Sequence, residues 1–279
     1  MVRNAALMML AIGPPDDPAD NPRVTDLSRY SDFLAFLDEQ HAADPDLRAA
    51  WVGGSAATGG YDEWSDLDVE VLCAPGTYLE VYRRLLRAIR ERFAPPDVWE
   101  LLESTYPDGR QCFVTLDPAP GALAAPTRLV DFVVWETTDE HRHKDVRRHG
   151  SPIVLFDPDG LVVERHDDEE DRRRAIEESV AQVRAQRPFG EWLVNRAIER
   201  GHLPEAVSLY LRFALQPAVY LVRVRDSYAR HNFGLRYLDT DIDPGDAARV
   251  DALLPGVERL RELSAECFAW QDELLASAG

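Results

Sequence analysis

The sequence has little cysteine and no long apolar run. Its 279 residues include three cysteines, Cys73, Cys112 and Cys267, which lie far apart, so neither a disulfide framework nor a cysteine-based zinc site is expected. Two of them fall in apolar, strand-like segments, which favours small buried thiols in a reducing compartment. No apolar run approaches the roughly 20 residues of a membrane-spanning helix. We therefore expect a cytoplasmic protein without a membrane segment.

Positive charge is also scarce. The chain has 50 acidic residues against 31 Lys and Arg, which gives a formal net charge of −19 at pH 7, and its one lysine is Lys144. Because a surface of this sign repels the phosphate backbone, a non-specific nucleic-acid-binding protein is not expected. The acidity is compatible with a cationic small substrate.

The two halves of the chain have different patterns. Residues 1–24 end in the turn-rich run GPPDDPADNP, and we expect a flexible leader there. The segment 25–166 mixes both periodicities: helical spacing over 25–40 and 76–93, and β-branched or aromatic strand patterns over 49–54, 110–116, 127–136 and 152–160. These patterns predict an α/β domain with a small mixed sheet and flanking helices.

From 167 to 279 the pattern is helical throughout. Acidic residues fill the first turn near 167, where the helix dipole favours them. The apolar run 203–231 predicts one long helix, kinked at Pro217. We expect an all-α bundle, with the functional site in the cleft between it and the first domain.

Two carboxylates open an apolar strand in the stretch WVGGSAATGGYDEWSDLDVEVLC, which runs from Trp51 to Cys73. Residues two apart on a strand point to the same face, so Asp66 and Asp68 are expected side by side. Close carboxylates repel unless a cation lies between them. Mg²⁺ is a suitable cation, since it takes one or two carboxylates together with phosphate oxygens.

A third carboxylate, Asp131, lies in the middle of the apolar run RLVDFVVW. An ionised Asp is costly to bury unless it is paired or binds metal. If its strand lies beside that of Asp66 and Asp68, the three carboxylates converge as in sites for two-metal phosphoryl or nucleotidyl transfer. The small residues Gly54 and Ser55 upstream would let the backbone approach a phosphate chain and hold it.

Gly54, Ser55, Asp66, Asp68 and Asp131 together resemble the signature of the DNA polymerase beta-like nucleotidyltransferase superfamily. The resemblance covers roughly 25–160. More weakly, the helical half looks like that of antibiotic adenylyltransferases of the aminoglycoside 6-adenylyltransferase type, through LPEA with its long helix and HNFGLRYL at 231–238.

The resemblance implies a nucleotidyltransferase that uses ATP and two Mg²⁺ ions. Asp66 and Asp68 would bind the metal, and Asp131 would complete the metal site or act as base. The helical domain would bind a small-molecule acceptor.

The sequence departs from this family pattern in one place. Many relatives carry Arg or Lys directly after Gly-Ser, whereas Ala56 and Ala57 stand here. The triphosphate would then need cations from elsewhere, and we name Arg196 and Arg236 of the helical half as candidates.

Simpler interpretations stay open. Asp66 and Asp68 could be solvated acids at a strand edge, Asp131 could be paired with Arg128, and Ser55 could be a helix N-cap. At the level of function, the alternatives are nucleotide transfer to a protein, as in antitoxin-type members of the superfamily, and a nucleotide-binding module that has lost catalysis.

Overall fold

The computed structural model describes residues 25–256, except 107, 118–126 and 139–142. The expected leader, the last part of the chain and Cys267 lie outside these residues. The described residues form two compact units, which divide between Asp168 and Glu169 and are considered separately.

The first unit is a mixed α/β structure, which confirms the predicted fold class. Its elements are η1 (Ser28–Tyr30), α1 (Ser31–Ala43), β1 (Leu47–Val52), α2 (Gly54–Thr58), β2 (Leu67–Cys73), α3 (Tyr78–Phe93), β3 (Val98–Glu100), η2 (Glu103–Thr105), β4 (Gly109–Thr115), β5 (Leu129–Glu136), α4 (Val146–His149) and β6 (Ile153–Phe156). The six strands form one sheet in the order β3-β4-β5-β2-β1-β6. Only β2 and β5 run parallel, and every other neighbouring pair is antiparallel.

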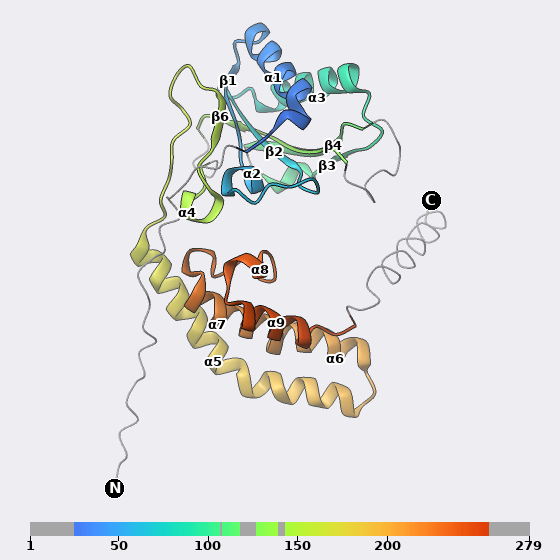
Figure 1. Ribbon diagram of the computed structural model, residues 1–279, viewed down its shortest axis with the longest axis vertical. Helices are drawn as coiled ribbons and strands as arrows, with labels where there is room; N and C mark the ends of the chain where they lie inside the picture. The colour runs from blue at the N-terminus through green and yellow to red at the C-terminus, as the bar shows by residue number, and fades with distance from the viewer. Residues whose placement is uncertain (1–24, 107, 118–126, 139–142, 257–279) are drawn as a thin grey trace. The chain divides into compact units, whose positions relative to one another are not determined.

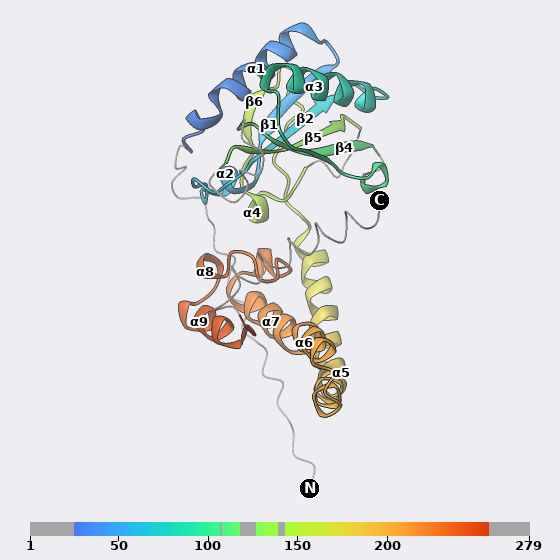
Figure 2. The same ribbon diagram turned by 90° about the vertical axis from the view of Figure 1, so that its right-hand side faces the viewer.

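The main core lies between one face of this sheet and helices α1 and α3. Figures 1 and 2 both show these two helices on the same side of the sheet, with the short helices α2 and α4 on the other. Alternate residues of β2, Leu67, Val69 and Val71, are buried in this core. The apolar side of α3 meets them, as the sequence predicts, through Val81, Tyr82, Leu85, Leu86 and Ile89.

The opposite face of the sheet is only partly apolar. Ala49, Trp51, Leu72, Val133 and Trp135 form a small cluster there. The other residues of β2 on this face, Asp68 and Glu70, are acidic. This face therefore combines a limited hydrophobic cover with buried charge.

The second unit is helical, as predicted. It contains α5 (Glu169–Glu199), α6 (Leu203–Tyr210), the π-helical turn η5 (Leu211–Leu215), α7 (Gln216–Asp226), η6 (Tyr228–Arg230), α8 (Leu238–Asp241) and α9 (Pro244–Leu253). The long helix predicted over 203–231 runs without a break from 203 to 226 as α6, η5 and α7, and it ends earlier than predicted. Pro217 cannot donate a backbone hydrogen bond and its ring crowds the preceding turn, which explains a wider turn just before it.

A buried ion pair stabilises the loop region of the helical unit. Arg223 is fully buried and donates to Asp241 at 2.7 Å and to the carbonyl of Gly234 at 2.8 Å. Asp241 also accepts from Arg230 at 2.8 Å. No helix among the described residues is long and apolar enough to cross a membrane.

Candidate functional site

Asp68 and Asp131 lie directly opposite each other on the neighbouring parallel strands β2 and β5. Residues paired in this way point to the same face of the sheet, here the face opposite α1 and α3. Asp66 immediately precedes β2, and its charge acts on both Asp68 and Asp131. The structure thus places Asp68 and Asp131 side by side, with Asp66 near enough for its charge to act on both.

The proton affinities of these carboxyl groups reflect their crowding. Burial, together with the charges of Asp66 and Asp131, raises the pKa of Asp68 to about 7. Burial also raises the pKa of Asp131, and the hydrogen bond from Gln111 opposes that rise. Two neighbouring carboxyl groups that hold their protons more tightly than usual are a favourable place for a cation.

The start of α2, from its N-cap Gly53 to Ser55, forms a turn that lies against Asp68. Gly54 has a φ of +57°, and a Cβ at this position would lie 1.7 Å from Oδ2 of Asp68. The preceding amide of Gly53 donates to the Asp68 carbonyl at 2.9 Å. Glycine is needed at 54 both for the left-handed backbone and for the close approach to the carboxylate.

Ser55 is the second residue of α2, and the N-cap is Gly53, so the N-cap alternative for Ser55 is wrong. Its hydroxyl oxygen is buried and has no hydrogen-bond partner among the described residues. An unpaired buried hydroxyl costs free energy unless it meets a ligand or an ordered water. Ser55 therefore has an unused donor in the turn that contacts Asp68.

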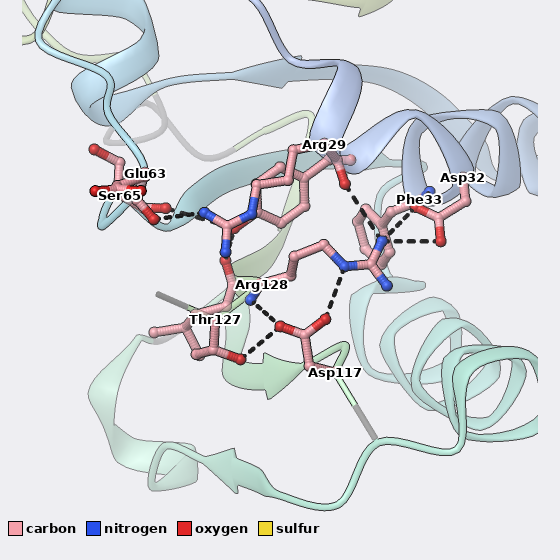
Figure 3. A network of polar contacts seen from close by, with 10 residues as sticks. Arg29, Asp32, Phe33, Glu63, Ser65, Asp117, Thr127 and Arg128 are labelled. Atoms are coloured by element: carbon pink, nitrogen blue, oxygen red, sulfur yellow. Dashed lines mark hydrogen bonds and ion pairs between the residues drawn. The ribbon is translucent and has the colours of Figure 1, made fainter. Parts of the chain in front are cut away.

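Asp131 is not paired with Arg128. It accepts a hydrogen bond from Nε2 of Gln111, on the adjacent strand β4, at 2.5 Å. Arg128 instead bonds both oxygens of Asp32, at 2.8 and 2.9 Å, and Oδ1 of Asp117 at 3.1 Å (Figure 3). The alternative of an Asp131–Arg128 salt bridge is therefore wrong.

The same network holds the segment that leads into β2. Figure 3 shows Arg29 reaching the loop that contains Glu63 and Ser65, where it donates to the Glu63 carbonyl. Tyr30, which is fully buried, donates to the carbonyl of Leu129 at the start of β5 at 3.1 Å. These bonds fix the approach to Asp66 relative to the strand that carries Asp131.

Two further charged residues of this face were not among the candidates from the sequence. Glu70 is buried and accepts hydrogen bonds from Nε1 of Trp135 at 3.0 Å and from Nζ of Lys144 at 2.8 Å. The second of these residues is Lys144. It is 74 positions away from Glu70 in the sequence, so no local pattern could reveal the ion pair. The one signal in the sequence was that Glu70 continues the alternation of Asp66 and Asp68.

Arg196 and Arg236 belong to the helical unit. The guanidinium of Arg196 lies 4.7 Å from the ring centre of Trp192. Arg236 is exposed, lies 5.1 Å from the ring centre of Tyr237 and donates to its hydroxyl at 3.0 Å. Their assignment to a triphosphate stays a prediction.

The donor set fits a hard cation that retains water. Among the described residues, no group of three or more His, Cys, Asp or Glu side chains is close enough to hold a metal ion. Mg²⁺ does not need such a cage, because it binds one or two carboxylates and completes its coordination with water and phosphate oxygens. Facing carboxylates with raised proton affinity and an unpaired hydroxyl beside them meet this requirement.

Comparison with known proteins adds little to this geometry. No family model matches the sequence, and no curated protein matches it. Among solved structures, the chain is similar to terminal uridylyl transferase 4 from Trypanosoma brucei with bound GTP, at 17% identity and a TM-score of 0.29. That alignment covers 72% of this chain and 54% of the other, so the chain matches about half the length of that structure. Likeness at this level carries no argument, and the function has to be argued from the site itself.

Proposed function

We propose that the protein is a Mg²⁺-dependent nucleotidyltransferase that moves a nucleoside monophosphate, AMP from ATP, to a hydroxyl group of a small-molecule acceptor. The observation that carries this proposal is the pairing of Asp68 with Asp131 across β2 and β5, with Gly54 set against Asp68. A site of this kind places acidic ligands beside a backbone turn that a phosphate chain can approach closely.

The proposed roles follow from the chemistry of each group. Asp66 and Asp68 would hold Mg²⁺, which when bound neutralises phosphate charge and stabilises the oxygens that attack and leave. Asp131 would complete the metal site or act as the base. The Ser55 hydroxyl has a free hydrogen to donate to a phosphate oxygen. Glycine at 54 lets the Asp68 carboxylate lie directly against the start of α2.

The reaction forms a bond between the acceptor oxygen and the α-phosphorus and breaks the bond between that phosphorus and the oxygen that bridges the α- and β-phosphates, which leaves with pyrophosphate. The hydroxyl proton passes to a carboxylate, for which Asp131 is the candidate. Its pKa is raised mainly by burial, which makes it a better proton acceptor than an ordinary aspartate.

The proposed acceptor is a cationic small molecule of the aminoglycoside type, bound by the helical unit. The net charge of −19 supports this assignment, because a strongly acidic protein attracts cations over long range. Transfer to a protein side chain is the main alternative.

The test is incubation of the full chain with labelled ATP, Mg²⁺ and a panel of aminoglycosides, nucleosides and proteins. Label on a small molecule, with release of pyrophosphate, supports the proposal. Label on protein supports the alternative, and nucleotide binding without pyrophosphate release identifies a binding module.

Matched variants show whether any transfer belongs to this site. Asp68→Asn should abolish transfer, whereas Asp38→Asn, which changes an exposed carboxylate of α1, should not. Equal activity of the two variants would refute the assignment.

A further inference from the structure

Glu70 is a buried carboxylate that the proposed reaction does not use. Its side chain is 5% exposed and lies on the same face of β2 as Asp68. Oε2 accepts from the indole of Trp135, and Oε1 accepts from the ammonium of Lys144. Burial of a carboxylate is costly unless it is hydrogen-bonded and paired with a cation, so Glu70 requires a partner such as Lys144.

Lys144 is less buried than its partner, with a side chain that is 49% exposed. An ammonium group has three donors. Among the described residues it makes one hydrogen bond, to Glu70. The group is therefore held in place at one donor and has two more that solvent or a ligand can reach.

The backbone next to Lys144 is firmly fixed. The side chain of Asp145 is fully buried and accepts hydrogen bonds from the amides of Arg147 at 2.7 Å and Asp167 at 2.8 Å. At the other end of α4, a Cβ on Gly150 would collide with the carbonyl of Ala57 in α2. The segment after Lys144 is thus attached to the helix that follows the Gly53–Ser55 turn.

The ammonium lies beside the proposed phosphate turn. Oε1 of Glu70, which Lys144 contacts at 2.8 Å, is also 3.7 Å from the place where a Cβ would stand on Gly53. The charge of Lys144 is felt at both metal-site candidates, since it opposes the rise that burial causes in the pKa of Asp68 and of Asp131. A cation thus lies close to the Gly53–Ser55 turn, although Ala56 and Ala57 follow it.

We propose that Lys144, held by Glu70, binds the triphosphate of the nucleotide donor. This inference rests on the proposed nucleotidyltransfer. A lysine ammonium binds phosphate as a compact point charge, and its charge-assisted hydrogen bonds are stronger than neutral ones. Glu70 keeps the ammonium at the turn, and its free donors bind the phosphate oxygens that arrive there.

The experiment measures equilibrium binding of a non-hydrolysable ATP analogue with Mg²⁺, by calorimetry on the full chain. Lys144→Met removes the charge but leaves Glu70 buried and unpaired, so the double variant Glu70→Gln with Lys144→Met is the decisive one. Arg92→Met, which removes an exposed cation of α3 on the other face of the sheet, is the matched control.

The expected result is a loss of affinity for the analogue of roughly tenfold or more in the double variant, because a hydrogen bond to a charged group contributes about 1.5–3 kcal/mol and 1.4 kcal/mol is tenfold. The affinity of the double variant for AMP, which lacks the β- and γ-phosphates, should fall by a smaller factor. Arg92→Met should bind within a few-fold of the unaltered chain. Glu70→Gln alone keeps the ammonium but weakens its hold, so this variant should lose affinity for the analogue, though less than the double variant does.

Unaltered affinity in the double variant would overturn the inference and leave Lys144 as a counterion for Glu70 alone. The inference is also overturned if the double variant loses as much affinity for AMP as it loses for the triphosphate analogue. If the unaltered chain binds neither nucleotide, the proposed function fails and this inference fails with it. The two failures are therefore distinguishable.

Discussion

Replacement of Gly54 by alanine tests how closely the turn and the carboxylate are fitted. The backbone at Gly54 has a φ of +57°, and a non-glycine residue in this left-handed region costs about 1–2 kcal/mol. The new Cβ would also lie 1.7 Å from Oδ2 and 2.4 Å from Cγ of Asp68. Rotation about χ2 of Asp68 moves Oδ2 but leaves Cγ in place, so relief requires a change of χ1 that pulls the carboxylate out of its position, or a shift of the backbone. Overpacking of this kind costs a further ~1–3 kcal/mol.

Gly59, the C-cap of α2, provides a matched control at the other end of the same short helix. It has a φ of +76°, but a Cβ there would meet nothing within 4 Å. Gly59→Ala should therefore lower the free energy of unfolding only by the cost of the left-handed backbone, about 1–2 kcal/mol. The difference between the two substitutions isolates the collision with Asp68.

The assay is urea unfolding of both variants without divalent cations, followed by the double variant Gly54→Ala with Asp68→Ala. Because Asp68→Ala removes the atoms that collide, Gly54→Ala should cost no more than Gly59→Ala in that background. If Gly54→Ala and Gly59→Ala are equally destabilising in the unaltered chain, or if the cost at Gly54 is the same with and without the carboxylate, the reasoning is refuted.

Three further predictions concern other charged groups. Asp68 holds its proton more tightly when folded, with a pKa of about 7 against 3.8, so the metal-free protein should lose stability as the pH rises from about 4 to about 7, at up to ~1.4 kcal/mol per pH unit. Asp68→Asn should flatten that slope in urea unfolding at several pH values, and an unchanged slope would contradict the pKa. Asp131→Asn keeps an oxygen that can accept from Gln111, so the fold should persist in circular dichroism while transfer falls by roughly a hundredfold or more, since metal-assisted charge stabilisation supplies several kcal/mol. Arg223→Met leaves the buried Asp241 with Arg230 as its remaining cation and should destabilise the helical unit by about 1–3 kcal/mol in thermal unfolding, whereas a loss well below 1 kcal/mol would mean that the pair is not desolvated.

The strongest periodic segments of the fold could be predicted from the sequence. The apolar stripe of 76–93 specifies α3, and its inward residues Val81 to Ile89 are the ones that pack on the sheet. The apolar run around Asp131 specifies β5. In both segments the local pattern and the tertiary environment agree, so the pattern alone is sufficient.

Other elements were not predictable for physical reasons. β3 has only three residues, Val98–Glu100, and Trp99 is exposed, so it lacks the alternation of a half-buried strand. The π-helical turn Leu211–Leu215 has the same apolar composition as the helices around it. Its position depends on how the chain accommodates Pro217, which composition does not show.

Some residues of the candidate site could likewise be named from the sequence, and others could not. Asp66 and Asp68 could be named from strand alternation, and Asp131 from the cost of burying a lone carboxylate. Lys144 could not, because its partner Glu70 is distant in sequence and the pairing is decided by the return of the chain after β5. The sequence also could not show that Gln111 bonds to Asp131, since that contact depends on how β4 pairs with β5.

The alternation along β2 has a consequence for how substitutions in this strand would be tolerated. Leu67, Val69 and Val71 contact the helices, whereas Asp68 and Glu70 lie on the charged face. A saturation library scored for cellular abundance should therefore be most sensitive at the odd-numbered positions. The same library scored for enzymatic output should add strict requirements at the even-numbered ones, so that two kinds of selection act on alternate residues of a single strand.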